Sequence, residues 1–527
     1  MRHIWAAGLA LALLASTATA PQAASPPNML VIGTDLSAVP SLDPAAINAR
    51  TVSEVVSNLY DNLVQIAPND MQTIRPMLAE SWTVSPDKRT ITFTMRKGAV
   101  FASGNPITAE DAAWSIRRVI KMAQVGSTDV ALWGYTPENV DKFIRATDER
   151  TLVVELPEPV ATDLVIYSLA GSSLGIIDSK VALKNEKNGD LARDWLKGNA
   201  APSGPFSLIQ WRPNDILITE SRANYWAGAP AMKRVIMRHV PESGSLRLQL
   251  MAGDIDVAQY VGAGDLEALA KEKVVIDQVP GFGFYYIALN TKDPDLAKPL
   301  VRRAFQHVLD WKALAQTSMR FAGYPWQSII PKGMVGAPAN PLPGYEYDPA
   351  LAKKLLAEAG YPNGLKKKLF PSGPALLQNT EALQASAKLA GIELELVPGE
   401  HTPDFRARNF EVLMGNSGAR LPDPFGTAVQ YAYNPDNRDA AKLGAYYLWR
   451  VAQEAPELTK MVDQSKAETD PAKRKALFED MDKRYREMDP GLIVLFQRTD
   501  PYVIRANVKG YFGHQTWSTR WASVTKE

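Results

Sequence analysis

The sequence predicts a protein of mixed α and β structure with more than one lobe. Its 527 residues suggest about three domains, or fewer large ones, at about 150 residues per domain. Segments that alternate polar and apolar residues, as strands do, occur on the same chain as segments with the apolar period of a helix. The sequence has no fixed-period repeat and no low-complexity tract. The class is therefore α/β or α+β.

The first 24 residues have the pattern of a secretory signal peptide. Arg2 supplies the positive charge, and residues 4–15 form an apolar run of about 12 residues that small residues follow. We expect cleavage between Ala18 and Ala24. The run is too short to span the ~30 Å hydrocarbon core of a bilayer. We therefore expect the mature chain to be exported to the periplasm without a membrane anchor.

A hairpin and a helix are the first elements of the mature chain that the pattern defines. Residues 81–84 and 90–95 alternate polar and apolar side chains, with turn-type residues between them, which predicts a hairpin with one buried face. Thr108 and Asp111 have the spacing of a capping box at the start of an apolar stripe with helical period. They predict a helix that begins after Thr108.

Two later helices and a strand have equally clear boundaries. Asp348-Pro349 and Asp470-Pro471 each place an N-cap residue before a proline at the first helical position, so we expect a helix after each pair. Residues 492–496 form a short apolar run directly after a proline and a glycine. Such a short run favours a buried strand over a helix.

Composition and charge limit the classes of function. The chain has 58 Lys and Arg against 57 Asp and Glu, so it lacks the basic excess that nucleic-acid binding requires. Cysteine is absent, which excludes disulfides, thiolate metal sites, cysteine nucleophiles and a lipid-modified N-terminal cysteine. We expect no nucleic-acid partner.

A series of short motifs extends over nearly the whole mature chain. They are SLDP (41–44), YDNL (60–63), RPMLAESW (75–82), TAED (108–111), SGPF (203–206), NYW (224–226), AGDID (252–256), ALN (288–290), VRRA (301–304) and EAGYP (358–362). In this order they resemble the extracellular solute-binding proteins of family 5, which are the peptide/nickel-type binding components of bacterial ABC importers. Most of these residues look structural, so they identify the scaffold and leave the ligand open.

The resemblance implies an α/β fold of two lobes around a cleft, joined by two chain crossings. Lobe I would comprise residues 25–284 and 499–527, with an extra subdomain at about 62–205, and lobe II residues 285–498. Such a protein would capture a small ligand, a short peptide or an acidic peptide-like molecule, by hinge closure and deliver it to a membrane permease. The implied receptor is monomeric, is not an enzyme and needs no cofactor.

The resemblance also indicates the loops that face the cleft. In peptide-binding members, the loop after residues 410–414 carries an aspartate that pairs with the ammonium group of the peptide. Here that position falls on Ala419 or Arg420, so the usual peptide assignment is in doubt. The other residues of the expected ligand site are Asn48, Arg50, Trp133, Tyr260, Tyr285, Asn416, Asp423 and Arg498.

Three arginines in this set suggest an anionic ligand. The planar guanidinium groups of Arg50, Arg420 and Arg498 suit bidentate capture of a carboxylate or phosphate. Each arginine could instead be a surface residue or a partner in an internal salt bridge. The aromatic residues could equally be core residues, and Asp423-Pro424 is also ordinary turn chemistry.

Two alternative functions stay open. Residues 171–175 match the G-x-S-x-G elbow of serine hydrolases, which requires a strand before Ser173, at about 164–169, and a helix after it. A turn of small residues is the simpler interpretation. His401 is the candidate ligand for a receptor of a metal chelate, because it precedes the segment that leads to the cleft loop. The mature chain has no local histidine chelate spacing.

Overall fold

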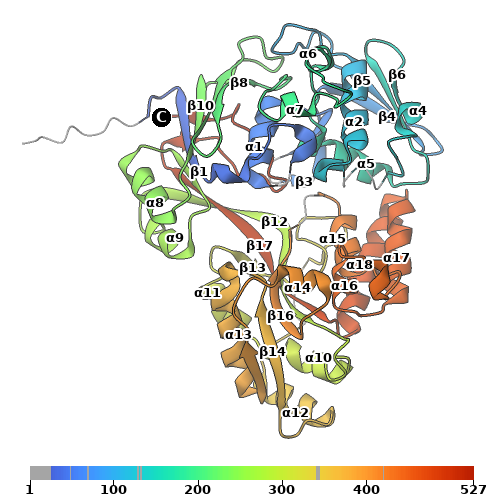
Figure 1. The fold of residues 1–527 in the computed structure, drawn as a ribbon, viewed down its shortest axis with the longest axis vertical. Helices are drawn as coiled ribbons and strands as arrows, with labels where there is room; N and C mark the ends of the chain where they lie inside the picture. The colour runs from blue at the N-terminus through green and yellow to red at the C-terminus, as the bar shows by residue number, and fades with distance from the viewer. Residues whose placement is uncertain are drawn as a thin grey trace, which may run out of the picture.

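The structure, a computed structural model, describes residues 25–47, 49–67, 70–127, 130, 133–339, 345–418 and 421–527. The predicted signal peptide and two residues of the expected ligand site, Asn48 and Arg420, lie outside the described residues. Strands and helices alternate along the chain, which confirms the mixed α/β class. Figure 1 shows a broad upper part and a tapering lower part.

A sheet of 11 strands runs through both parts of the molecule (Figure 1). One strand, β13 (Gly323–Pro325), pairs with β17 beside the main path. The order along the path is β15 (Ile392–Leu396), β14 (Leu365–Pro371), β16 (Val412–Asn416), β12 (Val274–Leu289), β17 (Leu492–Arg505), β11 (Val257–Gln259), β1 (Met29–Thr34), β10 (Arg234–His239), β9 (Ile216–Ser221) and β8 (Phe206–Arg212).

The two longest strands, β12 and β17, connect the upper and lower parts. They are antiparallel partners over most of their length, with a register shift between Pro280 and Phe284. Below the shift β12 also pairs with β16, and above it β17 pairs with β11. Both expected crossings, at 284–286 and 498–499, lie on these strands. The predicted apolar strand at 492–496 is confirmed as the first third of β17.

The upper part contains a second sheet of four strands and the predicted hairpin. This sheet has the order β4 (Ala79–Val84), β5 (Thr90–Met95), β7 (Thr151–Glu155) and β6 (Ile144–Ala146). β4 and β5 form the hairpin, and β5 alternates buried and half-buried residues. The smaller pairs are β2 (Val64–Ala67) with β3 (Asp70–Pro76) and β18 (Val508–Lys509) with β19 (Thr525–Lys526).

The predicted helix boundaries are confirmed because their caps form. Thr108 accepts from the backbone of Asp111, whose carboxylate accepts from Thr108 in return, and Asp348 and Asp470 cap two later helices. The upper part contains α1 (Arg50–Leu59), α2 (Ala109–Met122), α4 (Val140–Phe143), α5 (Thr162–Leu169), α6 (Ser179–Lys184), α7 (Arg193–Leu196), α8 (Ser243–Ala252) and α9 (Ala263–Leu269). The lower part contains α10 (Pro299–Gln306), α11 (Trp311–Gln316), α12 (Pro349–Glu358), α13 (Leu377–Leu389), α14 (Thr402–Ala407), α15 (Phe425–Tyr431), α16 (Tyr447–Arg450), α17 (Pro456–Ala467) and α18 (Pro471–Glu487).

The upper and lower parts also pack against each other away from the two long strands. The largest buried apolar cluster contains Leu164 of α5 together with Tyr286 of β12 and Met461 of α17. At its rim the backbone N–H of Ala161 donates to the carbonyl of Lys466 at 2.8 Å, and the Lys466 ammonium lies 2.7 Å from the Glu158 carboxylate. The two parts therefore touch at two separate places.

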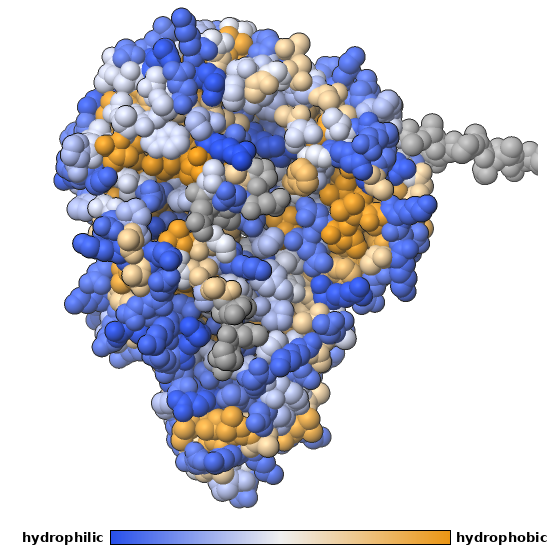
Figure 2. Space-filling model, turned by 180° about the vertical axis from the view of Figure 1, so that it is seen from behind, coloured by the Kyte–Doolittle hydropathy of each residue, from blue (hydrophilic) through white to orange (hydrophobic). Residues whose placement is uncertain are grey.

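The surface is mostly hydrophilic, and apolar residues gather on it in separate patches (Figure 2). The largest exposed apolar side chains include Leu248 and Met251 of α8 and Val275 at the start of β12. Among the described residues, no helix combines the length and the apolar character that crossing a membrane would require.

Candidate functional site

Arg50 and Arg498 come together around one carboxylate. Arg50 Nη1 lies 3.3 Å from Asp500 Oδ1, and Arg498 Nη2 lies 3.6 Å from the same oxygen. Arg50 is the first residue of α1, whereas Arg498 and Asp500 stand two positions apart on β17, so their side chains emerge on one face of the strand. We name Arg50, Arg498 and Asp500 the arginine cluster. It lies where β17 joins the upper and lower parts.

Two aromatic rings hold the Arg50 guanidinium in place. Its central carbon lies 4.0 Å from the ring centre of Tyr260 and 4.9 Å from that of Tyr502, a cation–π arrangement. Tyr260 has a left-handed backbone with φ of 60°, which is costly for a bulky residue. Its hydroxyl also accepts from Thr51 at 3.2 Å. The residue remains 42% exposed, so it can contact a ligand.

Counted by itself, the arginine cluster carries one excess positive charge, because two guanidinium groups share one carboxylate. Burial raises the pKa of the neighbouring Glu54, and the charge of Arg50 opposes this increase. Arg50 is buried and its Nε has no hydrogen-bond partner among the described residues. Burial lowers the pKa of Arg50, but Tyr502, Asp500 and Tyr260 outweigh it and raise the pKa above its ordinary value. Arg498 is 30% exposed at its side chain. Of the two arginines, Arg498 is the one that a ligand can reach.

Tyr285 and Asn416 lie beside Arg498 at the same level of the sheet. Tyr285 of β12 pairs with Asn416 of β16 and with Phe496 of β17. Burial raises the pKa of Tyr285, and the adjacent Arg498 guanidinium opposes this increase. Arg498 Nη1 also donates to the carbonyl of Ser417 at 3.2 Å. The loop that leads to Arg420 therefore starts in contact with Arg498 at Ser417.

Trp133 and Asp423 are internal residues, separate from the arginine cluster. Trp133 is fully buried in the largest apolar cluster, where its ring contacts the edge of Tyr135. Asp423 is buried and pairs with both terminal nitrogens of Arg474, at 2.7 and 2.8 Å. It also accepts from the backbone of Phe425 at 2.8 Å. Neither side chain is among those that the structure brings together around Asp500, and their place in the ligand site stays a prediction.

The surroundings of Ser173 differ from those of a nucleophile elbow. Residues 164–169 belong to helix α5, and Ser173 lies in the short 3-10 helix η4 (Ser172–Leu174). The expected strand before the serine is therefore wrong, because the apolar run packs as a helix against the core. An elbow needs that strand to expose its serine, and Ser173 is buried.

His401 uses both of its ring nitrogens within the protein. Nδ1 lies 2.8 Å from the Asp404 carboxylate, and Nε2 lies 3.1 Å from the carbonyl of Val397. Its ring packs against the edge of Phe370. Within the described ranges, no group of three or more His, Cys, Asp or Glu residues could hold a metal ion.

Reasoning from the sequence missed the carboxylate at the centre of the arginine cluster. Asp500 also accepts from the indole of Trp517 at 3.0 Å. The Arg-x-Asp spacing on a predicted crossing was the available signal, since such residues share one strand face. Behind the cluster, the buried Glu54 accepts from Gln259, Tyr511 and Trp521. No local pattern in the sequence connects these four residues.

Comparisons with known proteins agree with this architecture. The family described as bacterial extracellular solute-binding proteins, family 5 Middle, matches residues 73–439. The "probable D,D-dipeptide-binding periplasmic protein DdpA" of Escherichia coli is 30% identical over 508 residues, which cover 95% of this chain and 94% of the relative. The "probable di/tripeptide-binding protein 5" of Pseudomonas aeruginosa is 27% identical, with 90% and 92% covered.

Solved structures share the fold over nearly the whole chain. The structure of HbpA2 from Haemophilus parasuis has a TM-score of 0.80 and 22% identity, and the match covers 95% of this chain and 100% of that one. The periplasmic binding protein DppA from Helicobacter pylori, in complex with the peptide STSA, has a TM-score of 0.73 and 25% identity, with 95% and 98% covered.

Proposed function

This chain belongs to the bacterial extracellular solute-binding proteins of family 5, and we propose that it captures a short peptide or an acidic peptide-like molecule for an ABC importer. Relatives are named for D,D-dipeptides and for di- and tripeptides, and the Helicobacter pylori protein holds a peptide. The mature, monomeric chain would act in the periplasm after signal cleavage between Ala18 and Ala24, and would deliver its ligand to the membrane permease.

The excess positive charge of the arginine cluster is the observation that supports an acidic ligand. Two guanidinium groups compete for Asp500 at 3.3 and 3.6 Å, distances longer than those of a good charge-assisted hydrogen bond. A ligand carboxylate would pair with the exposed side of Arg498, while Arg50 holds Asp500 in place. Tyr260 and Tyr285 would form apolar walls. Arg420 would add a third guanidinium group from the loop that follows Gly418.

Hinge closure is the mechanism that we propose for capture. Lobe I, residues 25–284 and 499–527, would rotate against lobe II, residues 285–498, about the register shift in β12 and β17. The ligand would stabilise the closed form by touching both lobes. The steps are binding, closure and release, with no covalent chemistry and no cofactor.

A dipeptide and its C-terminal amide test the ligand class directly. We expect D-alanyl-D-alanine or L-alanyl-L-alanine to raise the melting temperature, because a ligand that binds only the folded state at a hundredfold excess over Kd stabilises it by about 2.7 kcal/mol. The matching amide, which lacks the carboxylate, should bind at least tenfold more weakly by calorimetry. Equal affinity of acid and amide would contradict the role of the arginine cluster.

Solution scattering tests the closure separately. With the dipeptide that binds most tightly at saturation, the radius of gyration should decrease relative to the free protein. An unchanged radius of gyration, with binding established by calorimetry, would contradict hinge closure and leave the ligand class standing.

A further inference from the structure

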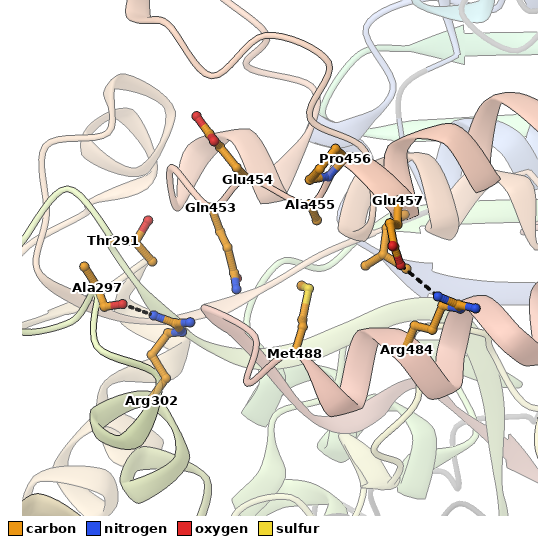
Figure 3. A pocket seen from close by; sticks show the side chains of 11 residues that line it. Thr291, Ala297, Arg302, Gln453, Glu454, Ala455, Pro456, Glu457, Arg484 and Met488 are labelled. Atoms are coloured by element: carbon orange, nitrogen blue, oxygen red, sulfur yellow. Dashed lines mark hydrogen bonds and ion pairs between the residues drawn. The ribbon is translucent and has the colours of Figure 1, made fainter. Parts of the chain in front are cut away.

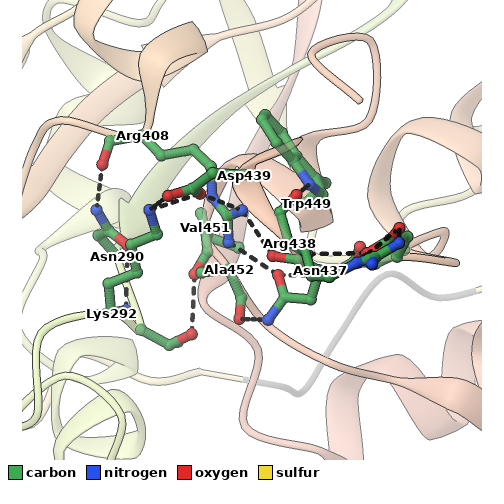
Figure 4. A network of polar contacts seen from close by, with 12 residues as sticks. Asn290, Lys292, Arg408, Asn437, Arg438, Asp439, Trp449, Val451 and Ala452 are labelled. Carbon is green, nitrogen blue, oxygen red and sulfur yellow. Dashed lines mark hydrogen bonds and ion pairs between the residues drawn. The ribbon is translucent and has the colours of Figure 1, made fainter. Parts of the chain in front are cut away.

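A pocket opens on the lower part of the molecule, between the end of α14, the 3-10 helix η6 (Asp439–Ala441) and α16. Its volume is about 310 Å³, and the described residues that line it are Arg406, Ala407, Arg408, Asp439, Lys442, Gly444 and Trp449. It shares none of these with the arginine cluster. Figure 4 shows the polar network that supports it, in which Arg408, Asp439 and Trp449 lie close together.

The lining of this pocket has more positive than negative charge. Three of the described lining residues are cationic, Arg406, Arg408 and Lys442, and one is acidic, Asp439. Asp439 already accepts from the Lys292 ammonium at 2.6 Å and from Arg408 Nη1 at 2.9 Å. Arg406 and Lys442 are exposed and form no ion pair within the part of the chain that the structure describes. Two cations at the rim are thus left without a counter-charge.

A further buried cation lies directly behind the wall of the pocket. Arg450 is 8% exposed, and its guanidinium donates to the carbonyl of Gly444 through Nε and Nη2. It packs over the rings of Phe405 and Tyr447, at 4.7 and 4.3 Å. No carboxylate of the described residues lies within ion-pair distance of it. Burial lowers the pKa of Arg450, and the nearby Arg406 contributes to the decrease.

The Arg408 guanidinium is fixed before any ligand arrives. It donates to the carbonyl and the side chain of Asn437, both at 2.8 Å, and stacks over Trp449 at 4.4 Å. Its Nε is buried without a hydrogen-bond partner among the described residues. Arg408 and Lys442 both have left-handed backbones, with φ of 61° and 50°. Each of them ends its short helix as the C-cap, a position where a left-handed backbone is common.

We propose that this pocket binds a small oxyanion with two negative charges, such as phosphate. Arg406 and Lys442 line this space together with the buried Arg408 and with Asp439, the only acid among the described lining residues. A dianion would balance the charges of Arg406 and Lys442, which form no ion pair among the described residues. The planar guanidinium group of arginine binds two oxygens of an oxyanion through paired donors, and lysine adds a point charge. The anion would be either free inorganic phosphate or the phosphate group of a monoester.

Calorimetry on the full mature chain tests this site at constant ionic strength. Inorganic phosphate and glycerol phosphate are the two probes, and they distinguish the free ion from an ester. We expect the double variant R406Q/K442Q to bind the better probe at least tenfold more weakly than the wild type. Both residues are exposed and form no ion pair with the residues that the structure describes, so the variant should fold normally. R438Q is the matched control, because Arg438 is a nearby exposed cation that pairs with Asp436 and does not line the pocket.

Each outcome decides the proposal. Weaker binding in the double variant, with the wild-type affinity kept in R438Q, supports it. Failure of both probes to bind the wild type, or equal affinity in all three proteins, would overturn it. The dipeptide affinity should be the same in R406Q/K442Q and wild type, so this result is independent of the proposed transport function.

Discussion

Two carboxylates in this molecule meet arginine in opposite ways. Asp423 pairs with Arg474 alone, through two short bonds, and both side chains are buried. Asp500 is shared between Arg50 and Arg498 at longer distances, and Arg498 is partly exposed. The sequence placed both Asp423 and Arg498 in the expected ligand site and missed Asp500. Under our proposal, the unbalanced and accessible charge beside Asp500 binds the ligand, whereas the fully paired Asp423 stabilises the fold.

Removing Arg474 gives the largest expected effect. The variant R474A leaves Asp423 buried without its counter-charge, and breaking a buried pair in this way costs about 3–5 kcal/mol. We expect a loss of that size in the free energy of unfolding, measured with urea. R484A is the control, because Arg484 forms its ion pairs on the surface, where they contribute little. Similar losses in the two variants would remove the contrast between the two carboxylates.

The next largest effect is a dependence of stability on pH that comes from His514. This residue lies three positions before Trp517, whose indole donates to Asp500. Burial lowers the pKa of His514 from 6.5 to about 4, so the unfolded chain takes up a proton in this window and the folded chain does not. Stability from this group is complete above pH 6.5 and is lost as the pH falls toward 4, by about 2 kcal/mol between pH 7 and pH 5.

The variant H514N isolates the contribution of this histidine. Its side-chain oxygen can accept from Thr516 as Nδ1 of His514 does, at 3.2 Å from the backbone nitrogen. We expect the free energy of unfolding of H514N to change less between pH 7 and pH 5 than that of the wild type. The same slope in both proteins would show that His514 is not the group that titrates.

Arg498 gives the smallest expected change in free energy, and that change is in binding. R498Q should lose at least tenfold in affinity for the dipeptide, about 1.4 kcal/mol, with little change in stability because the side chain is partly exposed. R498K should recover part of the loss, since lysine restores the charge without the planar fork. A loss of stability as large as that of R474A would place Arg498 with the structural pairs.

Local chemistry explains which predictions from the sequence were correct. The caps at Thr108, Asp348 and Asp470 form because each needs only residues within one turn of a helix. The arginine cluster joins residues about 450 positions apart, and Asp423, in the loop before α15, meets Arg474 of α18. Such pairings depend on how elements pack, and no local pattern records them. The strand expected at residues 164–169 is a helix for a similar reason, because a short apolar run fits a strand or a buried helix equally well.

Native mass spectrometry of the protein purified from its own periplasm tests the central claim most directly. The wild-type protein should carry a bound small molecule with at least one anionic group, and R498Q should carry it at clearly lower occupancy. R438Q should retain the wild-type occupancy. A bound molecule without an anionic group, or the same occupancy in R498Q as in the wild type, would contradict the claim that this receptor holds an acidic ligand through Arg498.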